Sequence, residues 1–451
     1  MRESAFRVMQ PPVLDQPAAP RPASATRTPR FLFFVVALTI GSSFYVNNEP
    51  APTDLLFLLL LFFAPFYRGF GLRFDMNPIL TLSVSAFLFC NLVSIWICVI
   101  NKPPGFEFVP STVYLAVTAY LFLFWYTISM LIRSYGLAMI NLIQFSFFFA
   151  TCIAALAGIL LHMGLVSHEA LGLQASGMRI TGTFKDPNVY GAFLGSGLAW
   201  LFISLLISRK LFLLKVGLLG FVLVGMVGGF SRGAFVNVAV SIITFFALRS
   251  AISLGTRWLK RFTGLILVAA LVGAPMTWWY LRDTGLEEFF SQRLELQRYD
   301  DKRFGTQLEA LGRLDESPFG VGPGQAATVL GQNTHNLYVN VAFEYGVLGG
   351  VSFYLFVLTT IWIGLSGVLR RGPYAMLYAS FLAILTGILV NSIVIDTLHW
   401  RHLFLFLALS VGLDRYERSR LSLVQHARPA FEMAIRQRPS RRPTVDQVSP
   451  S

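Results

Sequence analysis

Long apolar runs recur from residue 31 to residue 413 and restrict this chain to a membrane fold. Inside a bilayer every backbone amide and carbonyl must be paired within the protein, so only helices and closed barrels can span it. Barrel strands would alternate in polarity over about ten residues, whereas these runs are continuous. The charged fraction of 13% is about half the ~25% typical of soluble domains. We therefore predict an all-α polytopic membrane protein.

The apolar runs divide the chain into one long membrane domain, 31–413, and two flanking tails. No cleavable signal pattern precedes the first run, so we expect that run to remain as a span. The segment 1–30 is rich in proline, alanine and arginine and is predicted to be disordered, and 414–451 is a second basic tail. We predict about twelve transmembrane helices, near residues 31–47, 53–67, 78–100, 111–132, 136–163, 187–208, 211–229, 233–249, 262–281, 337–368, 374–395 and 399–413.

More than half of the net charge of +13 lies in the two tails. Positive charge beside spans marks the cytoplasmic side and attracts anionic lipid headgroups. The connections that would share this side also carry positive residues, namely Arg68, Arg73, Arg133, Arg209, Lys210, Arg249, Arg257, Lys260, Arg261, Arg370 and Arg371. Both termini are therefore predicted to be cytoplasmic. Nucleic-acid binding is disfavoured because neither tail combines basic and aromatic residues in a fold.

Two connections on the opposite side break this charge rule. The first, 163–188, contains Arg179 and Lys185. The second, 282–336, carries six basic and nine acidic residues, and its central part, 287–314, lacks proline and is rich in helix formers. Long loops without secondary structure are uncommon in compact domains. We therefore expect 282–336 to form one or two amphipathic helices over the membrane face and to carry function.

A motif at the end of the first outward connection combines a helix start with two cations. Asp186 and Pro187 are typical of a helix cap and a first helical turn. A structural loop explains these two residues but leaves Arg179 and Lys185 unexplained. Cations beside a helix N-terminus are typical of anion sites, so we predict that Arg179 and Lys185 bind an anion.

Two glycine-containing turns also lie on the outward side. The turn Ser231-Arg232-Gly233 carries a positive charge where few are expected. Arg232 is either a phosphate ligand or a cation that extends to the membrane surface. The loop 318–324 contains Gly320 and Gly322, whose exposed backbone amides are candidate oxyanion donors. It has no nucleotide-binding signature, since no GK[ST] sequence is present.

His335 lies where the long charged connection meets an apolar run. Histidine is the side chain whose ordinary pKa lies near working pH, so at this boundary it can exchange protons with lipid-borne and water-borne reactants. A structural histidine at a helix start is the alternative. Further along the chain, Asp396 is expected to pair with the cluster His399, Arg401 and His402.

No metal or cofactor site is predicted. The three cysteines, Cys90, Cys98 and Cys152, lie inside apolar runs without ligand spacing. His162 and His168 do not have a standard ligand separation, and Asp300-Asp301 is followed by two cations.

The outward motifs, in their order along the chain, resemble the superfamily of bacterial O-antigen ligases and polysaccharide polymerases. The resemblance covers residues 175–350 by motif and the whole chain by topology. The matching residues are Arg179, Gly182, Pro187, Asn188, Ser231, Arg232, Gly233, Arg303, Gly320, Gly322, His335, Asn336, Gly346 and Gly349. One departure is that the aromatic residue usual after the loop arginine is replaced within 305–307, so Arg298 and Arg313 are alternatives to Arg303.

The resemblance implies an enzyme of the bacterial inner membrane whose active site faces the periplasm. Such enzymes transfer a glycan from an undecaprenyl diphosphate carrier to the lipid A core of lipopolysaccharide, or to a second lipid-linked repeat in polymerases that make O-antigen or exopolysaccharide. By this resemblance His335 is the general base and Asn336 orients it or the sugar. The expected substrate ligands are Arg179, Arg232, Arg303, Lys185 and Asn188. The arginines would replace a divalent cation, and a single displacement would invert the anomeric centre.

Two other classes of membrane protein remain as alternatives. A lipid-glycan transporter would carry ionisable residues inside spans and internal repeats, whereas the unusual charges here gather on one face. A structural scaffold leaves the outward arginines unexplained. The sequence leaves open the glycan, the acceptor, the oligomeric state and the role of the C-terminal tail.

Overall fold

The computed structural model describes residues 30–47, 50–66, 76–103, 105–167, 179–252 and 298–436, with the single residues 169, 173 and 282; in the last range the side chains described are those of 301–422. Within these ranges every regular element is a helix, as predicted, and one isolated β-bridge joins Val46 to Phe184. The predicted disordered tail up to residue 29 and the predicted span 262–281 lie outside the described residues, as do parts of the two outward connections.

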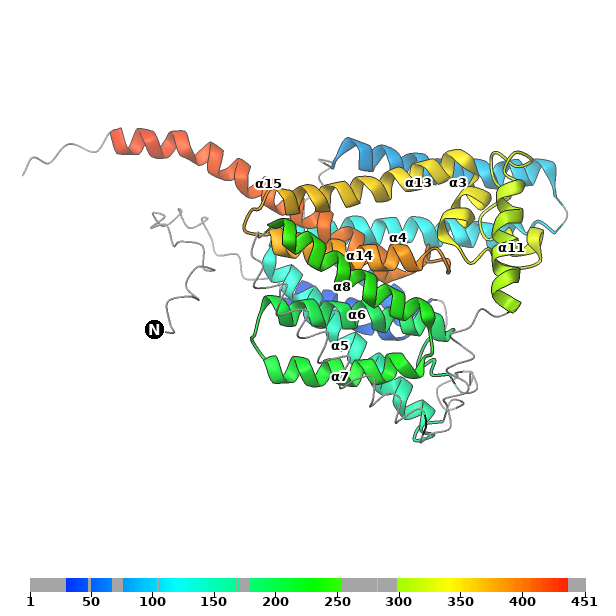
Figure 1. Cartoon of the computed structure of the whole chain (residues 1–451). Coiled ribbons are helices and arrows are strands. Elements are labelled where there is room, and N and C mark those ends of the chain that lie inside the picture. Colours follow the sequence, from blue (N-terminus) through cyan, green and yellow to red (C-terminus); the bar gives the residue numbers. More distant parts are fainter. Residues whose placement is uncertain are drawn as a thin grey trace, which may run out of the picture.

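Each predicted span within the described ranges coincides with a helix (Figure 1), and the ends differ by a few residues except for the last helix, which continues well beyond residue 413. Six of these helices are long and apolar enough to cross a membrane, and four shorter helices are also apolar. The membrane class is therefore supported, and the number of twelve spans stays a prediction. The helices up to the second outward connection are α1 (Arg30–Gly41), α2 (Pro52–Phe63), α3 (Pro78–Asn101), α4 (Phe108–Tyr135), α5 (Leu137–His162), α6 (Pro187–Ile207), α7 (Phe212–Gly228) and α8 (Arg232–Ile252).

The C-terminal part of the chain adds the outward helices and the end of the bundle. One of the predicted amphipathic helices of the second outward connection is present as α11, which crosses the end of the bundle (Figure 1). The remaining elements are α11 (Arg298–Gly312), α12 (Ala326–Leu330), α13 (Leu337–Leu369), α14 (Ala375–Asn391) and α15 (Arg401–Arg436), with short 3-10 turns at Ser42–Phe44 and Ala64–Phe66.

Helix α15 does not end at residue 413, as the apolar pattern predicts, but continues to Arg436. Hydrophobic pattern marks the end of lipid burial, not the end of a helix. Beyond that point Asp414 accepts hydrogen bonds from Arg418 one turn later, at 2.7 Å, and from Arg370 at the end of α13, at 2.9 Å. These ion pairs stabilise the helix and fasten it to α13 where it leaves the bundle (Figure 1).

The bundle has two chemically different ends. At one end the start of α1 lies beside the end of α4, with the rings of Phe33 and Tyr135 5.3 Å apart. Arg371 at this end donates to the carbonyl of Ala251 at the end of α8, at 2.9 Å. The opposite end carries α11 and the outward motifs (Figure 1). This separation of the two ends fits the predicted topology, and assignment of the first end to the cytoplasm stays a prediction.

Helix α13 is interrupted at Gly346, whose φ of 78° and ψ of 169° are non-helical. The glycine-rich loop 318–324 fills the interruption. Val321 N–H donates to the carbonyl of Phe343 at 3.0 Å, and Gly322 N–H donates to that of Glu344 at 3.1 Å. Because the amide of Gly324 also donates, at 2.9 Å, to the Glu344 carboxylate, these amides are engaged within the protein. Gly320 N–H donates in turn to the carbonyl of Ser317 at 2.9 Å, so the two candidate oxyanion donors, Gly320 and Gly322, are not available to a substrate.

Replacing Gly346 by alanine is expected to destabilise the protein. The backbone there occupies a region open only to glycine, which costs another residue about 1–3 kcal/mol. A Cβ would also lie 2.6 Å from the carbonyl oxygen of Pro318. Thermal unfolding in lipid nanodiscs measures the loss. Gly220→Ala in α7, where a Cβ meets nothing within 4 Å, is the matched control. A Gly346→Ala protein as stable as the wild type would contradict the non-helical backbone at Gly346.

Candidate functional site

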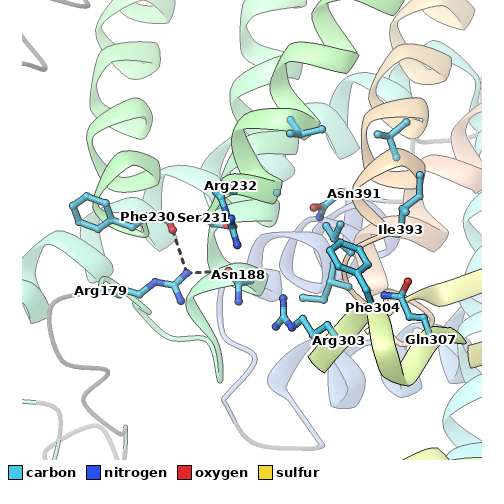
Figure 2. A pocket seen from close by; sticks show the side chains of 15 residues that line it. Arg179, Asn188, Phe230, Ser231, Arg232, Arg303, Phe304, Gln307, Asn391 and Ile393 are labelled. Carbon is cyan, nitrogen blue, oxygen red and sulfur yellow. Dashed lines mark hydrogen bonds between the residues drawn. The ribbon is translucent and has the colours of Figure 1, made fainter. Parts of the chain in front are cut away.

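A cavity of about 350 Å³ opens at the end of the bundle that carries α11. It lies between the start of α8, the end of α14, the inner side of α11 and the Arg179 segment (Figure 2). One side is cationic and another is aliphatic. Its lining residues are Arg179, Asn188, Phe230, Ser231, Arg232, Gly233, Val236, Arg303, Phe304, Gln307, Val390, Asn391, Ile393, Val394 and Ile395.

Arg179 is fixed by the turn that follows α7. Its Nε donates to the carbonyl of Gly229 at 3.0 Å, and its Nη2 donates to Oδ1 of Asn188 at 2.9 Å (Figure 2). Asn188 is in turn set by the predicted cap, since its backbone amide donates to the carboxylate of Asp186 at 2.6 Å. The cap prediction is therefore confirmed, and the cap places the first turn of α6 against the cavity.

Arg232 and Arg303 complete the cationic side. Arg232 is the first residue of α8, and Arg303 lies on α11. Figure 2 shows their guanidinium groups and that of Arg179 directed toward the same space. Three guanidinium groups around one cavity give it a positive potential. The arrangement is therefore suited to a multiply charged anion such as a diphosphate.

The glycine of the Ser-Arg-Gly turn is required by a close approach of α8 to α14. A Cβ at Gly233 would lie 2.2 Å from Oδ1 of Asn391, at the end of α14. Glycine therefore lets α14 reach the cavity with Asn391 and the aliphatic residues that follow it.

His335 lies beside the cavity, immediately before α13. Its backbone has a φ of +50°, which is uncommon for a residue with a side chain. Asn336 caps α13 by accepting from the amides of Tyr338 and Val339, at 2.9 and 3.1 Å, and its Nδ2 donates to Oε1 of Gln307 at 3.3 Å. Because Gln307 lines the cavity, this bond joins the His335 turn to the cavity wall.

The charges around His335 favour its neutral form. Burial and the positive charge of Arg303 hold the pKa of His335 below its ordinary value of 6.5, while Asp186 and Asp396 act in the opposite direction. A neutral imidazole can accept a proton near pH 7, as a general base must.

The structure brings together most of the predicted site residues. Arg179, Arg232, Arg303 and Asn188 line the cavity, and Asn336 reaches it through Gln307. Lys185 is exposed and does not line it.

Neither alternative to Arg303, Arg298 or Arg313, is seen to line the cavity. Arg313 pairs on the surface with Glu309 at 2.6 Å and does not line the cavity. The side chain of Arg298 lies outside the described residues.

The predicted pairing of Asp396 with the Arg401 cluster is wrong. Arg401 forms two hydrogen bonds with Asp54 at the start of α2, at 2.6 and 2.5 Å. Asp396 instead accepts from Nδ2 of Asn340 at 3.0 Å. Nearness in sequence suggested the first pairing, whereas the fold brings Arg401, the first residue of α15, to Asp54, 347 positions away in the sequence.

Four polar or aromatic wall residues, including Phe230 beside the Ser-Arg-Gly turn, were not predicted. Phe304 and Gln307 lie on α11, and Asn391 ends α14. Gln307 lies within 305–307, where the aromatic residue expected from the resemblance is missing. That difference could have drawn attention to Gln307. A single asparagine in an apolar run gave no comparable signal for Asn391.

Together these observations describe a helical membrane protein with a cationic cavity at one end of its bundle and a histidine beside it. In comparisons with known proteins, no family model matches the chain and no curated protein matches its sequence significantly. The functional inference therefore rests on the motifs and on the geometry of the cavity.

Proposed function

We propose that this chain is a membrane glycosyltransferase that moves a glycan from a polyprenyl diphosphate carrier to an acceptor hydroxyl, as O-antigen ligases do. The observation that carries the proposal is the meeting of Arg179, Arg232 and Arg303 in one cavity beside His335. These residues come from four separate segments of the chain. A structural role for any one of them does not explain why the three arginines line one cavity and the histidine lies beside it.

The proposed reaction is a single displacement. The acceptor oxygen attacks the anomeric carbon, the bond from that carbon to the diphosphate oxygen breaks, and His335 takes the hydroxyl proton. The arginines hold the diphosphate and stabilise the negative charge that grows on it, the task that a divalent cation performs in many sugar transferases. Attack from the face opposite the leaving group inverts the anomeric centre.

The aliphatic side of the cavity supports a lipid-linked donor. Val236, Val390 and Val394 line it together with the arginines. A site with cations on one side and aliphatic groups on the other suits a ligand with a charged diphosphate and an apolar tail. The carrier would therefore bind with its tail along α8 and α14.

The proposal is tested by transfer with purified protein in nanodiscs. The donor is an undecaprenyl diphosphate glycan, and the acceptors are lipid A core and a second lipid-linked repeat, each assayed with EDTA. Transfer to the core is the expected result. Ladder growth on the second acceptor would make the protein a polymerase with the same site, whereas no transfer to either acceptor would overturn the proposal and favour a transporter. Activity lost with EDTA and restored by a divalent cation would overturn the metal-independent mechanism.

The pH dependence of transfer tests the environment of His335. Because burial and Arg303 hold the pKa of His335 low, the acid limb of kcat/KM should lie below pH 6.5, the ordinary histidine value. Asp186→Asn removes a negative charge that raises this pKa but keeps a capping residue, so the limb should move to still lower pH. Asp301→Asn, an exposed change on α11, should leave it in place. A limb that Asp186→Asn does not move would show that His335 is not the titrating base.

A further inference from the structure

The backbone of His335 is held in place from both sides. Its positive φ costs free energy for a residue with a side chain, and such conformations persist where the surroundings enforce them. On one side the Asn336 cap and its bond to Gln307 provide this restraint. The other neighbour, Thr334, is fully buried, and its role is not explained by the proposed reaction.

Thr334 belongs to a short hydrogen-bonded chain. Its Oγ1 donates to Oδ1 of Asn340 at 3.1 Å, and Nδ2 of Asn340 donates to Oδ2 of Asp396 at 3.0 Å. The other oxygen of Asp396 accepts from the amide of Leu398 at 3.0 Å. Asn340 is 6% exposed and uses both ends of its amide, so its orientation is fixed.

The hydrogen bonds among Thr334, Asn340 and Asp396 connect two parts of the protein that flank the histidine. Thr334 directly precedes His335, and Asp396 lies in the connection between α14 and α15, with its charge acting on the imidazole. Asn340, in the first turn of α13, sets the distance between them. A change at either bond would let the His335 backbone relax or let the Asp396 carboxylate move.

We propose that Thr334 and Asn340 are positioning residues, which hold the His335 imidazole toward the cavity and fix Asp396 beside it. This inference rests on the proposed function, in which His335 accepts the acceptor proton. A misplacement of about 1 Å in a reacting group costs up to about 100-fold in rate. Removing a hydrogen bond between Thr334, Asn340 and Asp396 should therefore lower kcat. Binding of the carrier by the arginines should stay intact.

A matched pair of substitutions at Thr334 tests the proposal. Thr334→Val keeps the shape and removes the hydroxyl, whereas Thr334→Ser keeps the hydroxyl. We expect Thr334→Val to lower kcat roughly 10- to 100-fold with the KM for the donor unchanged, and Thr334→Ser to restore kcat to near the wild-type value. An unchanged kcat in Thr334→Val, or a rise in KM without a fall in kcat, would overturn the proposal.

Tyr338→Phe separates positioning from general loosening of α13. It removes a hydrogen bond of 2.8 Å from the Tyr338 hydroxyl to the carbonyl of Leu389, in the same helical turn but outside the chain that holds His335. Thermal unfolding is measured for each variant. If Tyr338→Phe lowers kcat as much as Thr334→Val at equal stability, the effect is not positioning and the proposal falls.

A second measurement does not depend on glycan transfer. Carbethoxylation of His335 by diethyl pyrocarbonate, followed by mass spectrometry across pH, reports the accessibility and the pKa of the imidazole. In Thr334→Val the loosened side chain should react faster and its pKa should rise toward the ordinary value, while Thr334→Ser should match wild type. Equal reactivity in all three proteins would overturn the positioning role. A wild-type protein that transfers no glycan yet shows the expected reactivity pattern would overturn the proposed function alone.

Discussion

Replacing His335 by alanine is expected to reduce glycan transfer by about 10²–10⁴-fold, the usual contribution of a general base. The substitution removes the group proposed to accept the hydroxyl proton and leaves the cationic side of the cavity intact. Folding should be retained, because the cap of α13 is provided by the neighbouring Asn336. The measurement is initial transfer rate with purified protein in nanodiscs.

The matched control is His162→Ala. His162 ends α5, is exposed and does not line the cavity, so its loss should leave the transfer rate unchanged. Retained transfer in His335→Ala, with a protein of wild-type thermal stability, would remove the base assignment. A fall in both variants would instead indicate a general effect of losing a histidine.

Replacing Arg303 by alanine should lower kcat/KM by about 10²–10³-fold, the typical loss when one contact to transition-state charge is removed. Arg303→Lys should recover only part of the rate, since an ammonium group lacks the planar fork that binds two phosphate oxygens. Transfer rates at several donor concentrations separate the effect on kcat from that on KM.

Arg313→Ala provides the comparison within the same outward connection. Arg313 pairs with Glu309 on the exposed side of α11, and exposed pairs contribute little to stability. We expect transfer to be unchanged. Equal losses in Arg303→Ala and Arg313→Ala would show that the cavity does not define the diphosphate site.

The helices were predictable from the sequence because the signals are local. A continuous apolar run sets each span, and Asp186-Pro187 sets the start of α6 at its observed residue. The meeting of Arg179, Arg232 and Arg303 was expected only from the resemblance. Their separate segments carry no periodicity that places them at one cavity.

The contacts that escaped the sequence are long-range or depend on backbone geometry. The bond between Asp54 and Arg401 joins residues 347 positions apart. The insertion of the glycine-rich loop at Gly346 uses backbone groups, which every sequence possesses. Helix α15 extends past its apolar part because of ion pairs at Asp414 that hydropathy does not register.

Helices α6, α8 and α13 all begin at or beside the cavity, with Asn188, Arg232 and Asn336 in or next to their first turns. The dipole of each helix places roughly half a positive charge at its start, and the capping bonds of Asp186 at α6 and Asn336 at α13 offset part of this. Backbone dipoles neither titrate nor disappear on side-chain substitution. The attraction for anions should therefore persist across the pH range in which His335 changes charge, so carrier retention and proton transfer can vary independently.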